Sequence, residues 1–173
     1  MTTGTHVKRN TAGGFTLVEA MISALIVATM LVAALNTVGA SARAQSTTTT
    51  SLRAWHMAGL LMAEIESLPY ADPDLIALPL GLDPGELAQD RSTFDDVDDY
   101  NAYTAAPATR RDGSLVCADS GWSFAVNVKW VDPAQPDAVA GTLFESNLKR
   151  IEVVVAYGGK PVANLMSLKA NVN

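Results

Sequence analysis

Carboxylates are the most concentrated chemical groups in this sequence. Asp95, Asp96, Asp98 and Asp99 fall within one short segment, and Asn101 follows them. Carboxylate and amide oxygens are the ligands that a hard cation such as Ca²⁺ prefers, so the four aspartates are a candidate calcium site. Their spacing departs from the helix-loop-helix calcium motif, which has a glycine at the turn and a distal glutamate. Three alternatives to a calcium site fit the same residues. They are a solvated acidic loop, a side-chain cap on a turn and a contact surface for another chain.

Residues suited to nucleophilic catalysis are few and lie far apart in the sequence. The histidines are His6 and His56, and the single cysteine, Cys117, is expected to be a buried structural thiol. The sequence has neither a glycine-rich phosphate loop nor a paired-cysteine metal motif. We therefore expect no enzymatic activity and no cofactor other than calcium. Because 18 Asp and Glu residues outnumber 12 Lys and Arg residues, we also expect no nucleic-acid partner.

One further carboxylate, Glu19, lies inside an apolar segment that covers residues 15–35. The segment follows a polar start that contains Lys8 and Arg9. A helix of about 20 apolar residues is long enough to cross a bilayer. An ionised carboxylate in lipid costs about 2.5 to 3.5 kcal/mol, so Glu19 calls for a compensating role.

Two general interpretations account for the apolar segment. A plain membrane anchor explains its composition and leaves Glu19 unexplained. An ordinary secretory signal explains the basic start, and Ala40-Ser41-Ala42 and Ala42-Arg43-Ala44 fit the small-residue cleavage pattern. Cleavage after Ala44 would release a soluble secreted or periplasmic binding module. These sites lie beyond the end of the apolar segment, which is itself at or above the upper length of a signal core.

A third interpretation rests on the segment Gly13-Gly14-Phe15-Thr16-Leu17-Val18-Glu19-Ala20. It resembles the amino-terminal signal of type IV prepilins and type II secretion pseudopilins. That signal joins a basic leader, a glycine before an aromatic residue, a carboxylate four residues later and a long apolar helix. The resemblance implies that a prepilin peptidase cuts between Gly14 and Phe15 and that the new amino group is methylated. Gly13, Gly14 and Phe15 are therefore the candidate processing residues.

The resemblance also implies an assembly role for Glu19. In the family, helices stack in a staggered bundle, and this carboxylate approaches the positive amino terminus of a neighbour, so that a costly charge becomes paired. A carboxylate that snorkels to the membrane interface is the alternative. The implied protein is a minor pilin or pseudopilin of a type IV pilus or type II secretion pseudopilus. Its partners would be other subunits, the prepilin peptidase and the bacterial inner membrane, which it would cross once with its amino terminus in the cytoplasm and its head in the periplasm.

The resemblance, together with composition and periodicity, implies that the chain has five segments. They are a leader (1–14), a transmembrane and assembly helix (15–36), a helical stem (37–68), a loop-rich connection (69–121) and a sheet (122–173). Helical spacing in the stem predicts an apolar stripe that includes Leu52 and Trp55, with Met62, Ile65 and Leu68 as core contacts. Pro69 should end that helix. The hydroxyl-rich residues 46–51 predict a weakened or kinked stem, since such side chains compete with the helical backbone.

Strand patterns dominate the carboxyl-terminal third. Apolar residues alternate over residues 122–130, with Trp122, Phe124, Val126, Val128 and Trp130 on one face. Residues 148–157 and 162–169 predict two more strands, and Gly158-Gly159 predicts the tight turn between them. Within the connection, Asp83-Pro84-Gly85-Glu86 predicts the start of a short helix. The expected fold is α+β and pilin-like, a long amino-terminal helix packed on an antiparallel sheet of three to four strands.

Overall fold

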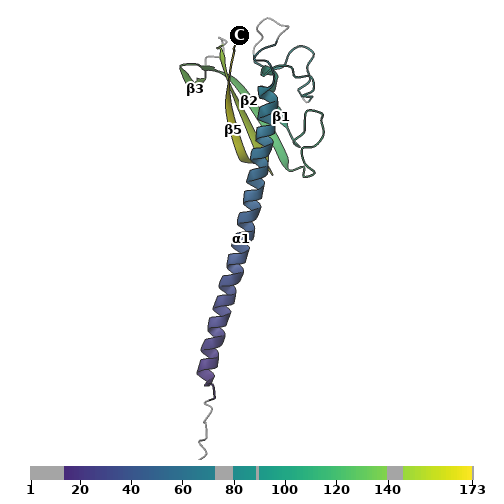
Figure 1. Cartoon of the computed structure of the whole chain (residues 1–173). Helices are drawn as coiled ribbons and strands as arrows, with labels where there is room; N and C mark the ends of the chain where they lie inside the picture. The colour runs from purple at the N-terminus through teal and green to yellow at the C-terminus, as the bar shows by residue number, and fades with distance from the viewer. Residues whose placement is uncertain (1–13, 73–79, 89, 140–145, 173) are drawn as a thin grey trace, which may run out of the picture. The chain divides into compact units, whose positions relative to one another are not determined.

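One long helix and a five-stranded antiparallel sheet make up the fold, seen in a computed structural model that describes residues 14–72, 80–88, 90–139 and 146–172 (Figure 1). The helix, α1 (Leu17–Glu66), has 50 residues. The strands are β1 (Thr104–Ala105), β2 (Trp122–Asp132), β3 (Gln135–Val139), β4 (Leu148–Tyr157) and β5 (Lys160–Ala170). This is the α+β, pilin-like arrangement that the sequence predicts.

The first turn of α1 is capped by its own sequence. The backbone N–H of Glu19 donates to Thr16 Oγ1 over 3.3 Å, and that of Ala20 donates to the Thr16 carbonyl oxygen over 3.1 Å. Thr16 is therefore the N-cap, and Glu19 occupies the third helical position, where a capping box has its acidic residue. A negative charge there also complements the helix dipole. This local role of Glu19 is one that the sequence analysis did not consider.

The hydroxyl-rich residues 46–51 do not interrupt α1, which is helical throughout its length. The tract therefore does not end the helix, and a weakened or kinked stem there stays a prediction. Serine and threonine cost at most about 0.7 kcal/mol each relative to alanine in a helix. Because helical turns already exist on both sides, propagation through the tract needs no new nucleus. α1 then ends at Glu66, shortly before Pro69, as predicted.

The chain forms two compact units that meet in sequence between Ser46 and Thr47, and each is described by itself. In the first unit, apolar side chains are exposed along α1. They include Leu17, Met21, Leu25, Met30, Leu31 and Leu35. Within the described residues, α1 is long and apolar enough to cross a membrane, judged by length and composition.

The second unit, Thr47–Asn173, contains the sheet. Its strands follow the order β1-β2-β4-β5, every pairing is antiparallel, and β3 pairs with the far end of β2. The three long strands match the predicted ones closely. β1 has only two residues and β3 contains Pro136, so neither carries the sustained alternation by which a strand is recognised in a sequence.

The hairpin between β4 and β5 turns at Gly158-Gly159, as predicted. Tyr157 and Lys160 are register partners, which leaves a two-residue loop. Both glycines have positive φ, +56° and +76°. A type I′ turn needs positive φ at both central residues and suits the right-handed twist of the strands, which explains the glycine pair.

The core lies between one face of α1 and the sheet. All five alternating apolar residues predicted for β2 are buried, and so are Ile151, Val153 and Val155 of β4. The buried residues of α1 are Ala54, Met57, Ala58, Leu61, Met62 and Ile65. The predicted stripe is thus partly wrong, since Leu52 is 66% exposed and Trp55 is 50% exposed. Two small residues four positions apart, Ala54 and Ala58, are buried instead of Leu52 and Trp55.

The connection between α1 and the sheet is partly ordered by buried aromatic residues. Phe94, Tyr100 and Tyr103 pack edge to face, with ring centroids 5.0 to 6.0 Å apart. A short 3₁₀ helix, η1 (Asp98–Tyr100), lies among them. The helix predicted at Asp83 is absent, because Gly85 has a φ of +113° and the chain makes only a turn there.

A fragment of residues 47–173 contains the whole core, so we expect it to fold by itself. In that fragment, Ile65→Ala should lower the free energy of unfolding by about 2 to 4 kcal/mol, because it leaves a cavity against the sheet. Leu52→Ala removes a similar side chain from an exposed position and should change the value by about 0.5 kcal/mol. Urea unfolding followed by circular dichroism measures both. Equal losses would show that the buried face of α1 is assigned incorrectly.

Candidate functional site

The predicted processing residues border the start of α1. Gly14 and Phe15 precede the helix, and Phe15 is 82% exposed. Glu19 is exposed one helical turn further on. Gly13 lies outside the described residues, as do the basic residues Lys8 and Arg9 of the leader. The proposed cleavage point thus falls in non-helical backbone directly before the capped first turn.

The acidic segment turns inward, and its aspartates have different surroundings. Asp95 is exposed, whereas Asp96 and Asp99 are buried. Asp96 Oδ1 accepts the backbone N–H groups of Asp98 and Asp99, and Asp99 Oδ2 accepts those of Asp95 and Asp96 over 2.9 and 3.0 Å. These are side-chain caps on a turn, one of the interpretations that the sequence left open.

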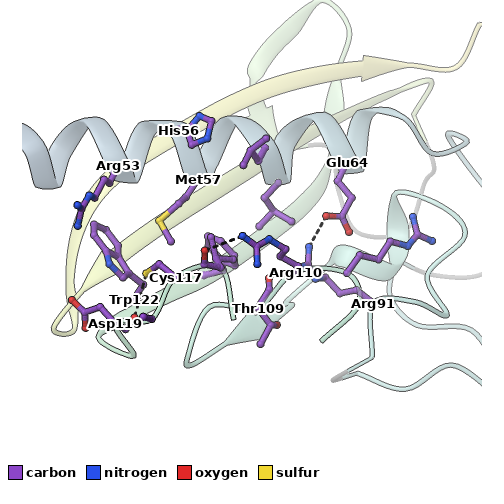
Figure 2. Close-up of a pocket in the computed structure, with 16 residues that line it drawn as sticks. Arg53, His56, Met57, Glu64, Arg91, Thr109, Arg110, Cys117, Asp119 and Trp122 are labelled. Carbon is purple, nitrogen blue, oxygen red and sulfur yellow. Dashed lines mark hydrogen bonds and ion pairs between the residues drawn. The ribbon is translucent and has the colours of Figure 1, made fainter. Parts of the chain in front are cut away.

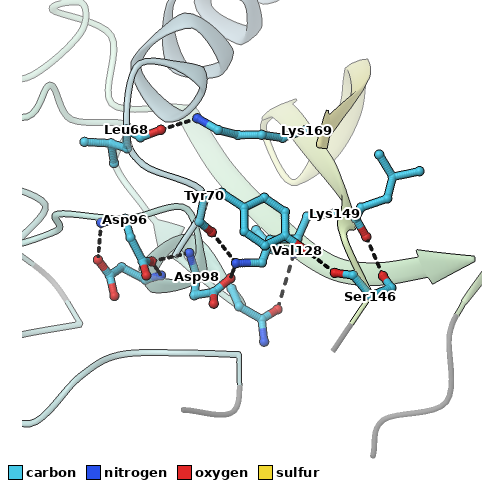
Figure 3. A network of polar contacts seen from close by, with 11 residues as sticks. Leu68, Tyr70, Asp96, Asp98, Val128, Ser146, Lys149 and Lys169 are labelled. Carbon is cyan, nitrogen blue, oxygen red and sulfur yellow. Dashed lines mark hydrogen bonds and ion pairs between the residues drawn. The ribbon is translucent and has the colours of Figure 1, made fainter. Parts of the chain in front are cut away.

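Asp98 is paired with a buried lysine that the sequence analysis missed. Lys149 is 0% exposed, and its Nζ lies 2.7 Å from Asp98 Oδ1. The same ammonium donates to the Tyr70 carbonyl oxygen and sits 3.9 Å from the centre of the Tyr70 ring (Figure 3). Lys149 alternates with Ile151 and Val153 along β4, so its place on the buried face was available from the period of two.

Burial makes this network electrostatically costly. Loss of solvation raises the pKa of Asp98 to about 6, although hydrogen bonding and attraction from Lys149 act in the opposite direction. Loss of solvation and then repulsion from Asp99 raise the pKa of Asp96 to about 6. Each charge is tolerated because it has specific partners. The network ties the connection to β4.

A second polar network fastens the connection to α1. Glu64 Oε2 lies 2.8 Å from Arg91 Nη1, and Glu64 Oε1 accepts the Tyr100 hydroxyl over 2.8 Å. Arg91 also donates to the Thr109 carbonyl oxygen and stacks on the Tyr103 ring. Buried arginine thus joins α1, the aromatic cluster and the segment before β2.

Three carboxylates meet where the turn at Gly85 approaches η1. They belong to Asp83, Glu86 and Asp99, and one oxygen from each lies within 4.8 Å of the others. Of the four aspartates predicted as metal ligands, only Asp99 belongs to this group. Loss of solvation, and to a smaller extent a side-chain hydrogen bond between Asp99 and Glu86, raise the pKa of Asp99 to about 7. Burial and the Asp72 carboxyl raise that of Asp83 to about 6. The sequence analysis did not single out Asp83 and Glu86, because they are separated from Asp99 in the sequence and no local pattern shows that the three carboxylates come together.

A pocket of about 770 Å³ lies beside α1 in the second unit (Figure 2). Cys117 and His56 both line it, and Figure 2 shows them on different sides of α1. Cys117 is partly buried and packs against the core, with its Sγ 3.4 Å from the Asp119 carbonyl oxygen.

The buried ion pair can be tested by removing one partner and then both. Lys149→Ala should lower the free energy of unfolding by about 3 to 5 kcal/mol, because Asp98 stays buried without its cation. The double variant Lys149→Met, Asp98→Asn should recover more than half of that loss. Lys160→Ala, on the exposed start of β5, is the control and should change stability by about 0.5 kcal/mol. A double variant no more stable than Lys149→Ala would show that the pairing is not what Lys149 supplies.

Comparison with protein-family models, with curated proteins and with solved structures finds no match to this chain. A function is therefore assigned from features of this chain alone. They are a long apolar amino-terminal helix packed at its far end on an antiparallel sheet, which is a pilin-like architecture, and the residues at the start of that helix.

Proposed function

We propose that this chain is a prepilin-like subunit that assembles through its amino-terminal helix into a type IV pilus or type II secretion pseudopilus. The observation that carries the proposal is the sequence Gly14-Phe15-Thr16-Leu17-Val18-Glu19 at the start of α1. A minor pilin or pseudopilin is favoured over a major pilus subunit by three features of the chain. They are its acidic composition, the lack of a second cysteine and the long connection between α1 and the sheet. The role is structural and not catalytic.

The local backbone supports cleavage after Gly14 over cleavage after Ala44. Gly14 and Phe15 lie in non-helical backbone, whereas Ala42 and Ala44 lie within α1, where a peptidase would first have to unwind the helix. Cleavage after Ala44 would also discard the apolar part of α1. Lys8 and Arg9 favour a cytoplasmic amino terminus by the positive-inside rule, which supports a periplasmic location for the second unit.

Glu19 has two candidate roles that differ in their dependence on charge. As part of a capping box it stabilises the first turn of its own helix, and glutamine serves that purpose as well as glutamate. As an assembly residue it pairs with the positive amino terminus of a neighbouring subunit, which requires the negative charge. Its position one turn from Phe15 suits both.

Processing is tested by the intact mass of the protein purified from membranes of cells that contain a prepilin peptidase. We expect a chain that begins at Phe15 with a methylated amino group and retains the whole of α1. The control is the variant Gly14→Val, which should stay uncut, because the site requires the small residue. A mature chain that begins at Gln45 would instead establish the alternative, a secreted or periplasmic binding module.

Assembly is tested by replacing Glu19 with alanine and, in parallel, with glutamine. Both variants should be processed and inserted, since each removes a charge that costs about 2.5 to 3.5 kcal/mol in lipid. Both should be lost from sheared filaments or from co-purified partner subunits, because neither pairs with an amino terminus. Normal assembly of Glu19→Gln together with failure of Glu19→Ala would assign Glu19 to helix capping alone.

A further inference from the structure

The pocket beside α1 combines an apolar lining with an excess of positive charge. Its charged lining residues are four arginines and two carboxylates, namely Arg53, Arg91, Arg110, Arg111, Glu64 and Asp119. The whole chain, by contrast, has a formal net charge of −6. Positive groups gathered in one pocket of an acidic protein indicate a site for an anion.

Both carboxylates of the pocket already have partners. Glu64 is paired with Arg91, and Asp119 accepts the Tyr157 hydroxyl over 2.8 Å. Within the part of the chain that the structure describes, no ion pair involves the other three arginines of the pocket. Their guanidinium groups therefore leave positive charge that a bound anion can neutralise.

Arg110 is already held in a defined orientation. Its Nη1 donates to the Leu115 carbonyl oxygen over 2.7 Å, and its Nη2 donates to that of Val116 over 3.2 Å. Figure 2 shows Arg110 between Trp122, toward one end of the pocket, and Arg91, toward the other. A guanidinium has five N–H donors, so Arg110 retains donors for a carboxylate. Because the group is fixed beforehand, less conformational entropy is lost when a ligand binds.

The apolar part of the lining comes from α1 and the sheet. Met57 and Leu61 of α1 and Trp122 of β2 belong to it and are buried, whereas Leu60, which also lines the pocket, is 56% exposed. A hydrocarbon chain placed there would be removed from water together with Leu60. The volume of about 770 Å³ lies within the range of small-molecule sites, which is about 300 to 1,000 Å³.

The backbone on both sides of the pocket is already hydrogen-bonded. On one side it belongs to the helix α1. On the other side, the Arg110 N–H donates to the Ser114 carbonyl oxygen over 2.7 Å, and the Val116 N–H donates to that of Ala108 over 3.0 Å. An added peptide strand requires unpaired backbone groups along an edge, so a small amphipathic molecule suits this pocket better than a peptide.

We propose that this pocket binds a fatty acid, with the carboxylate at Arg110 and the hydrocarbon chain along α1. The carboxylate accepts hydrogen bonds from the remaining donors of Arg110, a charge-assisted contact for which the guanidinium geometry is well suited. The chain covers Met57 and Leu60 and extends toward Trp122. The inference concerns residues of the second unit alone, so it does not depend on the proposed function.

The test uses the full chain in lipid nanodiscs, labelled with ¹³C at its methionine methyl groups and titrated with sodium octanoate. Met57 lines the pocket, whereas Met166 is 54% exposed on β5. We expect a saturable shift of the Met57 methyl resonance at about millimolar octanoate, with the Met166 resonance unchanged. Met21 and Met30, on the exposed apolar part of α1, report octanoate that the lipid takes up.

Matched substitutions test the two parts of the site separately. Arg110→Gln should weaken octanoate binding by about tenfold, whereas Lys160→Gln, at an exposed lysine outside the pocket, should leave the affinity within about twofold. Leu60→Gln should weaken binding several-fold through lost apolar contact. Leu52→Gln is its control, because Leu52 is an exposed leucine of α1 that does not line the pocket. Octanol has the same chain without the charge and should bind about tenfold more weakly than octanoate.

Several results would overturn the proposal. Octanol binding as tightly as octanoate would show an apolar cavity without a carboxylate site. Equal losses in Arg110→Gln and Lys160→Gln would assign the effect to overall charge, and equal shifts of Met57 and Met166 would indicate non-specific association. A shift of Met57 by a peptide of leucine and glutamate, without one by octanoate, would make the occupant a partner chain. If Arg110→Gln disturbs the fold, octanol and the Leu60→Gln variant still decide the question.

Discussion

Contact between one face of α1 and the inner face of the sheet is the interaction on which the second unit depends. Ala54, Ala58 and Ile65 are completely buried there and belong to the same core cluster as Val128 of β2 and Val153 of β4. Burial of one large aliphatic side chain contributes about 1.5 to 3 kcal/mol.

The same helix meets different demands along its length. From Leu17 to about Ser46 its apolar side chains are exposed, which is stable only if lipid or other helices cover them. From Thr47 to Glu66 it is amphipathic and packs on protein. A continuous helix is the one structure that satisfies its own backbone hydrogen bonds in both surroundings, which explains why hydroxyl-rich residues at the junction leave it intact.

The connection is held by charge as well as by apolar packing. It contributes few residues to the sheet, and its aromatic cluster is small. Buried pairs at Glu64–Arg91 and Asp98–Lys149 fasten it to α1 and to β4 at defined points. Such pairs add little net stability, since desolvation offsets their attraction, but leaving one partner alone is costly. They therefore select one placement of the connection, and the carboxylate group at Asp99 belongs to the same region.

Local pattern determined the regular elements. The alternation in β2 and β4, the glycine pair before β5 and the length of the apolar segment each depend on neighbouring residues, so the sequence alone placed the long strands and the helix. It also carried Lys149 on the buried face of β4 and the Thr16–Glu19 cap, although neither was recognised. Tertiary structure decided which face of α1 is buried, because hydropathy cannot show that Ala54 and Ala58 are buried while Leu52 is exposed. It also decided which carboxylates meet, since Gly85 with positive φ replaces the expected helix by a turn and brings Glu86 to Asp99 across a stretch of chain whose path no local pattern specifies.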